Sequence, residues 1–303
     1  MKLTKIKINN FFDKKKILIT GASGFVGQNL IKNLSKYNSN IVALYANRKL
    51  KFINSNIKLI KCDLTKKIPK KISNVKFDII IHLAGPKADR KSMKDESKIL
   101  TGILIDKNII ELAIKNKVKT FFYASTAGVY DTKIKTFDEK KISLNYNSDG
   151  LYGFSKLLGE EILLKSLKKS NLKICRFFSI YGKNSKTIIN FWEKKIKNNQ
   201  NIEIWGNGKT IRSWLHINDV ISGIIQILVH PNKNIFFNLG SCEKLTLNRI
   251  FKILKSKYIN SKSKIKYKMS INSGPKNRYT NSDEMKKIGW TQKVKLKEGI
   301  YFI

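Results

Sequence analysis

The amino-acid sequence predicts an α/β protein with a doubly wound parallel sheet and a smaller, interleaved C-terminal lobe. Short apolar runs alternate with segments of helical spacing along the first part of the chain. A turn containing three glycines joins the first clear apolar run to the first helical segment, and the pattern loosens after about residue 179. Strands that alternate with helices form a parallel sheet whose two faces the helices cover.

The predicted strands are short and apolar, as strands buried on both faces are. They are expected at residues 16–20, 41–45, 57–60, 77–82, 120–124 and 172–177. Between them, apolar residues recur on one helical face. Helices are therefore expected at residues 28–36, about 99–116 and 152–170.

Two interleaved parts are expected. Residues 14–178, together with about 213–240, form the predicted sheet domain. Residues 179–303 form the predicted second lobe, whose shorter segments end at turns rich in glycine and asparagine, at 205–208, 238–240 and 273–275. A chain of 303 residues can bury a substantial core in this arrangement.

The chain is strongly basic, with 61 Lys and Arg against 21 Asp and Glu and a formal net charge of +40. Nucleic-acid binders more often concentrate such charge in a tail or stripe. The lysines here are dispersed, and Ile and Asn are abundant as well, which favours a composition bias over a specific nucleic-acid partner. The charge still favours anionic substrates.

Composition also bears on the cellular compartment. No apolar run approaches the roughly 20 residues that a membrane helix needs, and residues 1–16 lack the apolar core of a signal peptide. We therefore expect a cytoplasmic protein without a membrane partner. Cys62, Cys175 and Cys242 are far apart, which predicts no metal site and no disulfide framework, but reduced thiols in or near the core.

The three glycines of the turn are Gly21, Gly24 and Gly27. Gly21 permits a tight turn, Gly24 lets the backbone approach a pyrophosphate, and Gly27 lets the helix pack closely on the strand. The N–H groups and the dipole at the helix start favour an anion. The turn thus predicts a dinucleotide site of the Rossmann type. The residues expected to contact the cofactor here are Gly21, Ser23, Gly24, Phe25, Val26 and Gly27.

Tyr152 and Lys156 stand four residues apart in a predicted helix, so their side chains share a face. A phenol titrates near pH 10 and is a poor base at neutral pH, but a nearby ammonium and a cationic nicotinamide both favour the phenolate. Lowering its pKa by about 3 units requires about 4 kcal/mol, which such charges supply in a dry site. Such a phenolate can take a proton from a substrate hydroxyl while hydride leaves for the nicotinamide.

The Gly-x-x-Gly-x-x-Gly spacing and several later motifs together resemble the extended short-chain dehydrogenase/reductase family of nucleotide-sugar epimerases and dehydratases. In chain order these motifs are Cys62-Asp63-Leu64, His82-Leu83-Ala84-Gly85, Ser125-Thr126-Ala127-Gly128-Val129-Tyr130 and Tyr152-Gly-Phe-Ser-Lys156. The resemblance covers nearly the whole chain, from about residue 16 to residue 290. It implies a Rossmann fold, an NAD or NADP cofactor and a nucleotide-diphosphate sugar substrate.

The resemblance assigns further cofactor contacts outside the glycine turn. Asp63 and Leu64 are expected to contact the adenine. Leu83, Ala84 and Gly85 are expected to lie beneath the cofactor, while Tyr152 and Lys156 reach its nicotinamide end, where the lysine holds the ribose.

The same resemblance makes Thr126 the catalytic hydroxyl, which hydrogen-bonds the reacting oxygen, and places Ser125 in contact with the substrate. The dehydratases of the family carry acidic residues directly after this hydroxyl, where they act as acid and base. This chain has Ala127 and Gly128 there, which cannot move a proton. The departure weakens 4,6-dehydration and decarboxylation and favours epimerisation or keto reduction.

The choice between NAD and NADP depends on the end of the second strand, where an acidic residue accepts the ribose hydroxyls of NAD. Counting from Gly27, that position falls at Tyr45, and the nearest cation is Arg48. The missing carboxylate removes repulsion against a 2′-phosphate, and Arg48 offers a guanidinium fork to bind one. The sequence therefore favours NADP over NAD.

A block in the second lobe resembles the family's Gly-x-Gly…Arg-x-x-x-His-x-x-Asp signature, at Gly206, Gly208, Arg212, His216 and Asp219. By this resemblance Arg212, together with Arg278, binds the diphosphate of the substrate, a role that suits a guanidinium. His216 and Asp219 are expected to form a hydrogen-bonded pair that ties the lobes together. Ser179 stands where the family has Asn before Tyr-Gly. It is the predicted substrate contact at this position, with a shorter side chain than Asn.

The leading hypothesis is an NAD(P)-dependent nucleotide-sugar epimerase that acts through a transient keto-sugar. The main alternative is an NADPH-dependent reductase of a 4-keto-6-deoxy nucleotide sugar. A 4,6-dehydratase and a non-enzymatic dinucleotide sensor are weaker alternatives, and the intact Thr126, Tyr152 and Lys156 argue against the sensor. The resemblance also implies a homodimer, formed through the helices at about 99–116 and 152–170.

Overall fold

The computed structural model describes residues 4–48, 50, 54–86, 95–131, 137, 139, 150–231, 236–269 and 277–303. Its centre is a seven-stranded parallel sheet in the spatial order β11, β6, β5, β4, β1, β2, β3. These strands are β1 (Lys16–Thr20), β2 (Asn40–Tyr45), β3 (Ile57–Lys61), β4 (Ile79–His82), β5 (Thr120–Thr126), β6 (Asn171–Phe177) and β11 (Phe236–Leu239). The predicted α/β class with a doubly wound parallel sheet is confirmed. The turn expected at 273–275 lies outside the described residues.

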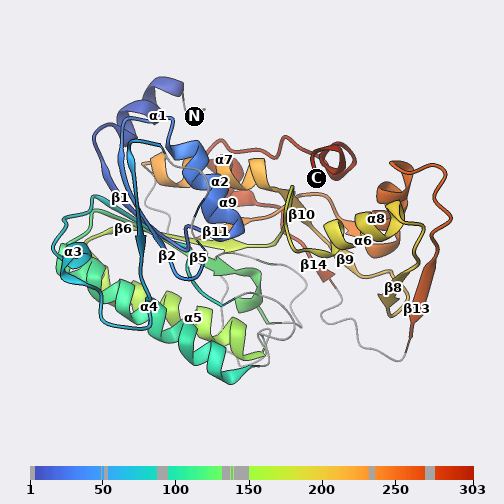
Figure 1. Cartoon of the computed structure of the whole chain (residues 1–303), viewed down its shortest axis with the longest axis horizontal. Coiled ribbons are helices and arrows are strands. Elements are labelled where there is room, and N and C mark those ends of the chain that lie inside the picture. The colour runs from blue at the N-terminus through green and yellow to red at the C-terminus, as the bar shows by residue number, and fades with distance from the viewer. Residues whose placement is uncertain are drawn as a thin grey trace.

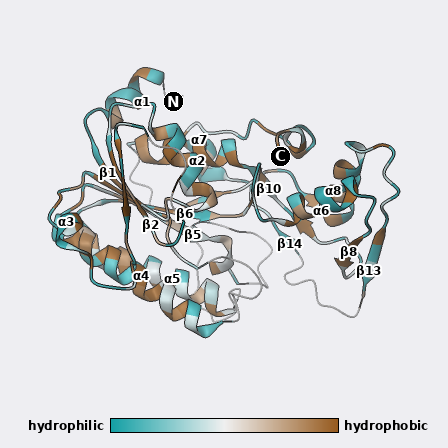
Figure 2. Cartoon of the chain, viewed as in Figure 1, coloured by the Kyte–Doolittle hydropathy of each residue, from teal (hydrophilic) through white to brown (hydrophobic). Residues whose placement is uncertain are grey.

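Helices cover both faces of the sheet, as Figure 1 shows. Ile17 and Ile19 of β1 point to one face and Leu18 to the other, because side chains alternate along a strand. This alternation creates two separate cores, and Figure 2 shows the hydrophobic character of β1 between them. The first core is closed by α2 (Phe25–Leu34) and α7 (Ile217–Val229), and the second by α3 (Lys70–Ser73), α4 (Glu96–Asn116) and α5 (Gly150–Ser166).

Helix α1 (Lys5–Phe12) and strand β11 are among the elements of the sheet domain that were not predicted. Helix α1 fully buries only Phe12, whose ring lies 5.1 Å from that of Tyr37, while Ile8 and Phe11 are partly buried against the same core. Strand β11 contains Asn238 and Leu239 of the segment expected as a turn at 238–240, and ends before Gly240. Its Asn238 is buried and accepts a hydrogen bond from the Tyr130 hydroxyl at 2.8 Å. The turn prediction was wrong because a tertiary partner satisfies a polar side chain inside the strand.

The chain after β6 builds the second lobe and then returns to the sheet through α7 and β11. The lobe has its own core, which includes Trp192, Ile204 and Leu254. Figure 1 shows α6 and α8 on the side of the molecule away from the sheet. Strands β9, β10 and β14 lie between these two helices and the sheet. The elements not yet named are β7 (Ser179–Tyr181), α6 (Ile188–Lys197), β8 (Ile202–Trp205), β9 (Ile211–Arg212), β10 (Trp214–His216), β12 (Leu245–Thr246), α8 (Leu247–Ser256), β13 (Ile265–Lys268), β14 (Asn277–Arg278), α9 (Asp283–Lys287), α10 (Leu296–Gly299) and the 3₁₀ helices η2 (Ala127–Val129) and η3 (Ile300–Phe302).

Two further expectations concern the cysteines and membrane-spanning helices. Cys62 and Cys175 are buried free thiols, as expected, but Cys242 is exposed. Across the described ranges, the helices are all too short or too polar to cross a membrane.

A buried ion pair joins the sheet to the helix that carries Tyr152 and Lys156. Arg176 of β6 is fully buried, and its Nε and Nη2 donate to the two carboxylate oxygens of Glu160 on α5 at 3.0 and 2.7 Å. Its Nη1 donates to the Tyr130 hydroxyl at 3.0 Å. This bidentate contact fixes how α5 lies on the sheet.

We predict that Glu160→Gln lowers the free energy of unfolding by about 3–5 kcal/mol, because it leaves the Arg176 charge buried without a carboxylate. Urea denaturation measures this change. The matched control is Glu161→Gln, which removes the neighbouring, half-exposed carboxylate and should change the stability by less than about 0.5 kcal/mol. Equal stabilities of the two variants would show that the pair does not hold α5.

Candidate active site

The predicted site residues of the sheet domain gather at one edge of the main sheet. All seven strands are parallel, so their carboxyl ends share this edge. Strand order reverses direction between β1 and β4, and ligands of open α/β sheets bind at such a switch point. The glycine turn follows β1, and the loop containing Leu83, Ala84 and Gly85 follows β4, so these two segments flank the switch point.

The glycine turn is closed too tightly for side chains. Gly21 has φ +65°, and a Cβ there would lie 2.8 Å from the backbone of Leu83 and Ala84. A Cβ on Gly27 would collide with the carbonyl oxygen of Gly21. The turn therefore needs glycine for its left-handed conformation at Gly21 and for the close packing of the helix at Gly27.

Helix α2 begins at Phe25, three residues earlier than predicted, with Gly24 as its N-cap. No side chain caps this end. The first N–H groups of the helix thus adjoin Ser23, Phe25 and Val26, at the positions predicted to bind a pyrophosphate. Glycines without room for a Cβ and an uncapped helix start together suit the phosphates of a dinucleotide.

The loop after β4 connects the glycine turn to Lys156. The N–H groups of Leu83 and Ala84 donate to the Thr20 hydroxyl oxygen at 3.2 and 3.1 Å, which fixes the loop beside the turn. On the other side, Lys156 Nζ lies 3.5 Å from the place of a Cβ on Gly85. The structure therefore brings Lys156 to the same loop that touches Gly21.

Tyr152 and Lys156 lie in the first half of α5 and are only 7% and 6% exposed. Lys156 Nζ donates to the Tyr123 hydroxyl oxygen at 3.2 Å and lies 3.5 Å from Asp106 Oδ2. Asp106 also accepts a hydrogen bond from His82. Sequence reasoning missed Asp106 and Tyr123. The only available signal was a carboxylate inside an apolar helix.

Thr126 and Ser125 end β5 but have different surroundings. Thr126 is half-buried and its hydroxyl oxygen accepts from the Gly128 N–H at 3.1 Å, which orients it at the carboxyl end of the sheet. The 3₁₀ helix η2 that it begins packs against α5. Ser125 is buried and donates to Glu160 Oε1 at 2.5 Å. Its hydroxyl therefore faces the ion pair with Arg176, an arrangement that does not favour the predicted substrate contact.

The residues predicted at the adenosine end of the cofactor follow β2 and β3. Tyr45 ends β2 half-buried, and Arg48 is exposed three residues later. Asp63 is exposed, and hydrogen bonds from the Thr65 hydroxyl and N–H hold the pKa of its carboxyl below the ordinary value. Leu64 beside it is buried.

In the second lobe, the two predicted diphosphate ligands lie side by side. Strands β9 and β14 are parallel, and Arg212 and Arg278 are register partners. Their side chains therefore leave the same face of the strand pair. Ser179 begins β7 and is half-buried, opposite Trp214 of β10.

The predicted hydrogen bond between His216 and Asp219 is wrong. His216 Nδ1 accepts from the Asn218 N–H at 3.3 Å as the N-cap of α7. Asp219 instead accepts from the N–H groups of Lys293 and Val294, at 3.2 and 2.8 Å. The carboxylate therefore ties α7 to the C-terminal segment, and backbone donors satisfy it in place of the imidazole.

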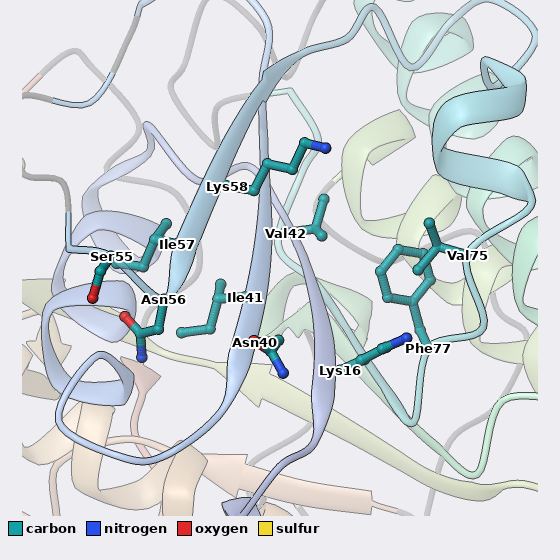
Figure 3. A pocket seen from close by; sticks show the side chains of 10 residues that line it. All are labelled: Lys16, Asn40, Ile41, Val42, Ser55, Asn56, Ile57, Lys58, Val75 and Phe77. Atoms are coloured by element: carbon teal, nitrogen blue, oxygen red, sulfur yellow. The ribbon is translucent and has the colours of Figure 1, made fainter.

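A pocket of about 390 Å³ lies at the opposite edge of the sheet (Figure 3). Its lining includes Lys16, Asn40 and Ile57, the first residues of β1, β2 and β3. Parallel strands separate their amino and carboxyl ends by their full length, so this pocket is remote from Tyr152 and Lys156.

Comparison with known proteins assigns the chain to a family. The model of the NAD dependent epimerase/dehydratase family matches residues 17–240. The chain belongs to this family. The resemblance read from its motifs is thereby confirmed.

Relatives of this epimerase/dehydratase family member include nucleotide-sugar epimerases. A putative UDP-glucose 4-epimerase from Methanocaldococcus jannaschii is 26% identical, over 94% of this chain and 95% of its own. An ADP-L-glycero-D-manno-heptose-6-epimerase from Brachyspira hyodysenteriae is 27% identical, over 80% and 81%. The solved UDP-glucuronic acid 4-epimerase from Bacillus cereus, in complex with UDP-glucuronic acid and NAD, has a TM-score of 0.84 at 24% identity, over 95% and 97% of the two chains. This last likeness shows the shared fold.

We predict that Gly27→Ala raises the dissociation constant for a nicotinamide dinucleotide at least about tenfold, because the new Cβ displaces the Gly21 carbonyl. Isothermal titration measures the affinity, and thermal denaturation verifies that the variant is folded. The control is Asn33→Ala near the other end of α2. A folded Gly27→Ala variant with unchanged affinity would remove the turn from the cofactor site.

Proposed function

We propose that this protein is an NAD(P)-dependent epimerase of a nucleotide-diphosphate sugar, with Thr126, Tyr152 and Lys156 as catalytic residues. The observation that carries the proposal is the position of Lys156 Nζ against Gly85. The loop that holds Gly85 also closes on the glycine turn, so the catalytic lysine and the dinucleotide turn share one wall of the site.

The residues present suit a nicotinamide dinucleotide, the cofactor found in the solved UDP-glucuronic acid 4-epimerase of Bacillus cereus. The turn from Gly21 to Gly27 would hold the pyrophosphate on the α2 start. The remaining cofactor contacts are assigned to Tyr45, Arg48, Asp63, Leu64, Leu83, Ala84, Gly85, Tyr152 and Lys156. Bound there, the nicotinamide supplies a reversible acceptor for a hydride from the sugar carbon.

The protein's own residues control the proton. Tyr152, as a phenolate, accepts the proton of the sugar hydroxyl, and the Lys156 ammonium one turn away stabilises that phenolate. Thr126 accepts from the Gly128 N–H and keeps its own proton to donate to the reacting oxygen. Their burial keeps competing water away from the exchange. Tyr152 would then return its proton to the carbonyl oxygen of the transient keto-sugar as the carbon regains its hydride on the opposite face, which completes the epimerisation.

The substrate is assigned to the second lobe. Arg212 and Arg278 would bind its diphosphate from neighbouring strands, and Ser179 would contact the sugar. A pocket of about 500 Å³ follows β7, with Ser185, Lys186, Thr187, Ile188, Asn190 and Phe191 in its wall. Its hydroxyls, amide and aromatic ring are suitable for a nucleoside.

The alternatives differ in the groups that they require. Dehydration and decarboxylation need an acid–base group beside the catalytic hydroxyl, and both Ala127 and Gly128 are buried without one. This argument holds although a UDP-glucuronic acid decarboxylase of Arabidopsis thaliana is among the relatives, at 24% identity. The NADPH-dependent reductase of a 4-keto-6-deoxy sugar uses the same residues and is the second candidate, favoured by Arg48.

A homodimer through α4 and α5 is part of the proposal. The two helices pack against each other on one face of the sheet (Figure 1). Helix α4 exposes Leu100, Leu104 and Ile114, at 67%, 40% and 46% of their surface. A second copy would cover these side chains, since an apolar strip of this kind marks association surfaces.

The deciding experiment incubates the purified protein with UDP-, dTDP-, GDP- and CDP-sugars and either cofactor, and follows sugar products by NMR and NAD(P)H by absorbance. We expect many turnovers without net cofactor consumption. Stoichiometric consumption of NADPH would instead establish the reductase.

Tyr152→Phe should reduce turnover by about 10²-fold or more while cofactor affinity is kept, because only proton transfer is lost. Unchanged turnover in this variant would exclude the proposed mechanism.

The preference for NADP can be tested separately. We predict that Arg48→Ala weakens NADP binding about tenfold and leaves NAD binding unchanged, because only NADP has the 2′-phosphate that the guanidinium binds. Titration of both cofactors measures this. Lys36→Ala, which removes an exposed cation at the end of α2, is the control. A parallel loss for both cofactors would mean that Arg48 acts only through general charge.

A further inference from the structure

A buried chain of hydrogen bonds runs from the loop after β4 to the lysine of α5. The Thr20 hydroxyl meets His82 Nδ1 at 2.6 Å, and His82 Nε2 meets Asp106 Oδ1 at 2.9 Å. The second carboxylate oxygen, Asp106 Oδ2, accepts from the Tyr123 hydroxyl and lies 3.5 Å from Lys156 Nζ. Strands β1, β4 and β5 and helices α4 and α5 each supply one member.

The donors and acceptors assign every proton in this chain. Thr20 Oγ1 accepts from the N–H groups of Leu83 and Ala84, so its own proton goes to His82 Nδ1. His82 must then carry its proton on Nε2 and donate it to Asp106. Burial lowers the pKa of His82, in agreement with a neutral imidazole.

Asp106 is an ionised carboxylate in this setting. Burial alone would raise its pKa, but the Lys156 charge and the hydrogen bonds from His82 and Tyr123 hold it below the ordinary value. The residue is 4% exposed. Helix α5 leaves little space beside Asp106 and Tyr123. A Cβ on Gly159 would collide with the Tyr123 hydroxyl and stand 3.0 Å from Asp106 Oδ2.

We propose that Asp106 is a positioning residue, whose buried carboxylate pairs with the Lys156 ammonium and directs it to the loop beneath the cofactor. The inference rests on the proposed function, since it matters for catalysis only if Lys156 serves the cofactor and Tyr152. Asp106 and the Tyr123 hydroxyl take two of the three N–H groups of the lysine. The third is left for a cofactor hydroxyl on the Gly85 side.

Few other charged groups act on the pair among the described residues. His82 faces it from β4 and Tyr123 from β5, and α5 contributes Tyr152 and Glu160, both close enough to influence Tyr123. Glu160 is already paired with Arg176. Asp106 is therefore the carboxylate that balances Lys156.

The test that needs no substrate compares how fast Lys156 is labelled by reductive methylation, which modifies only a neutral amine. Asp106→Asn removes the negative charge at nearly constant volume, so peptide mass spectrometry should show Lys156 labelled about tenfold faster at the same pH. Glu111→Gln, which removes an exposed carboxylate of the same helix paired with Lys107, should leave the rate unchanged. Equal rates in wild type and Asp106→Asn would overturn the proposal.

Tyr123→Phe provides a second variant, because it removes the hydroxyl and keeps the carboxylate. Its labelling rate should stay much closer to wild type than that of Asp106→Asn. An equal acceleration in both variants would also overturn the proposal, since loss of any hydrogen bond would then have the same effect as loss of the charge.

Kinetics distinguish the inference from the proposed function. In Asp106→Asn we expect kcat to fall about tenfold, KM for the sugar to stay nearly constant, and the alkaline limb of the pH profile to move to lower pH. A merely structural role would leave that limb in place, and this result would contradict the proposal. Absence of turnover in the wild-type protein with every sugar would refute the proposed function, while the labelling rates would still decide the role of Asp106.

Discussion

The contact between the glycine turn after β1 and the loop after β4 is the constraint on which the candidate site depends. The backbone of Leu83 and Ala84 passes so close to Gly21 that a side chain there has no space, and the Thr20 hydroxyl holds the loop in this position. Because the other side of the loop touches Lys156 Nζ at Gly85, a shift of the turn would also shift the position against which the lysine packs. The proposed cofactor site and the proposed catalytic pair are thus parts of one packed unit.

Much of this arrangement could be predicted because its signals are local. β1 and β4 are continuous apolar runs, Gly21 and Gly27 mark a turn without side chains, and Tyr152 and Lys156 share a face through helical spacing alone. These features depend on residues a few positions apart. In the folded sheet these residues lie at the carboxyl edge, since parallel strands end together there.

The rest depends on partners distant in sequence. Asp106 is recognisable as a partner of Lys156 only when α4 and α5 are packed, 50 residues apart along the chain. Ser125 was predicted to touch substrate from its motif, whereas Glu160 from another element takes its hydroxyl. β11 contains a buried Asn whose side chain is satisfied by the Tyr130 hydroxyl and the Phe137 carbonyl. Spacing rules cannot find such pairs, because they involve tertiary hydrogen bonds.

The burial of carboxylates also affects the exterior of the molecule. Asp106, Glu139, Glu160, Asp219 and Glu284 are all buried, in a chain with only 21 acidic residues in total. Lys156, Lys173 and Arg176 are buried as well, so burial raises the net charge of the exposed described residues by only two, on a chain whose formal net charge is +40. A field of this sign steers polyanions toward the molecule over distances comparable with the Debye length, so the encounter rate with a diphosphate ligand depends on ionic strength. This far field follows the net charge of the whole chain, the buried acids included, while the same acids order the interior.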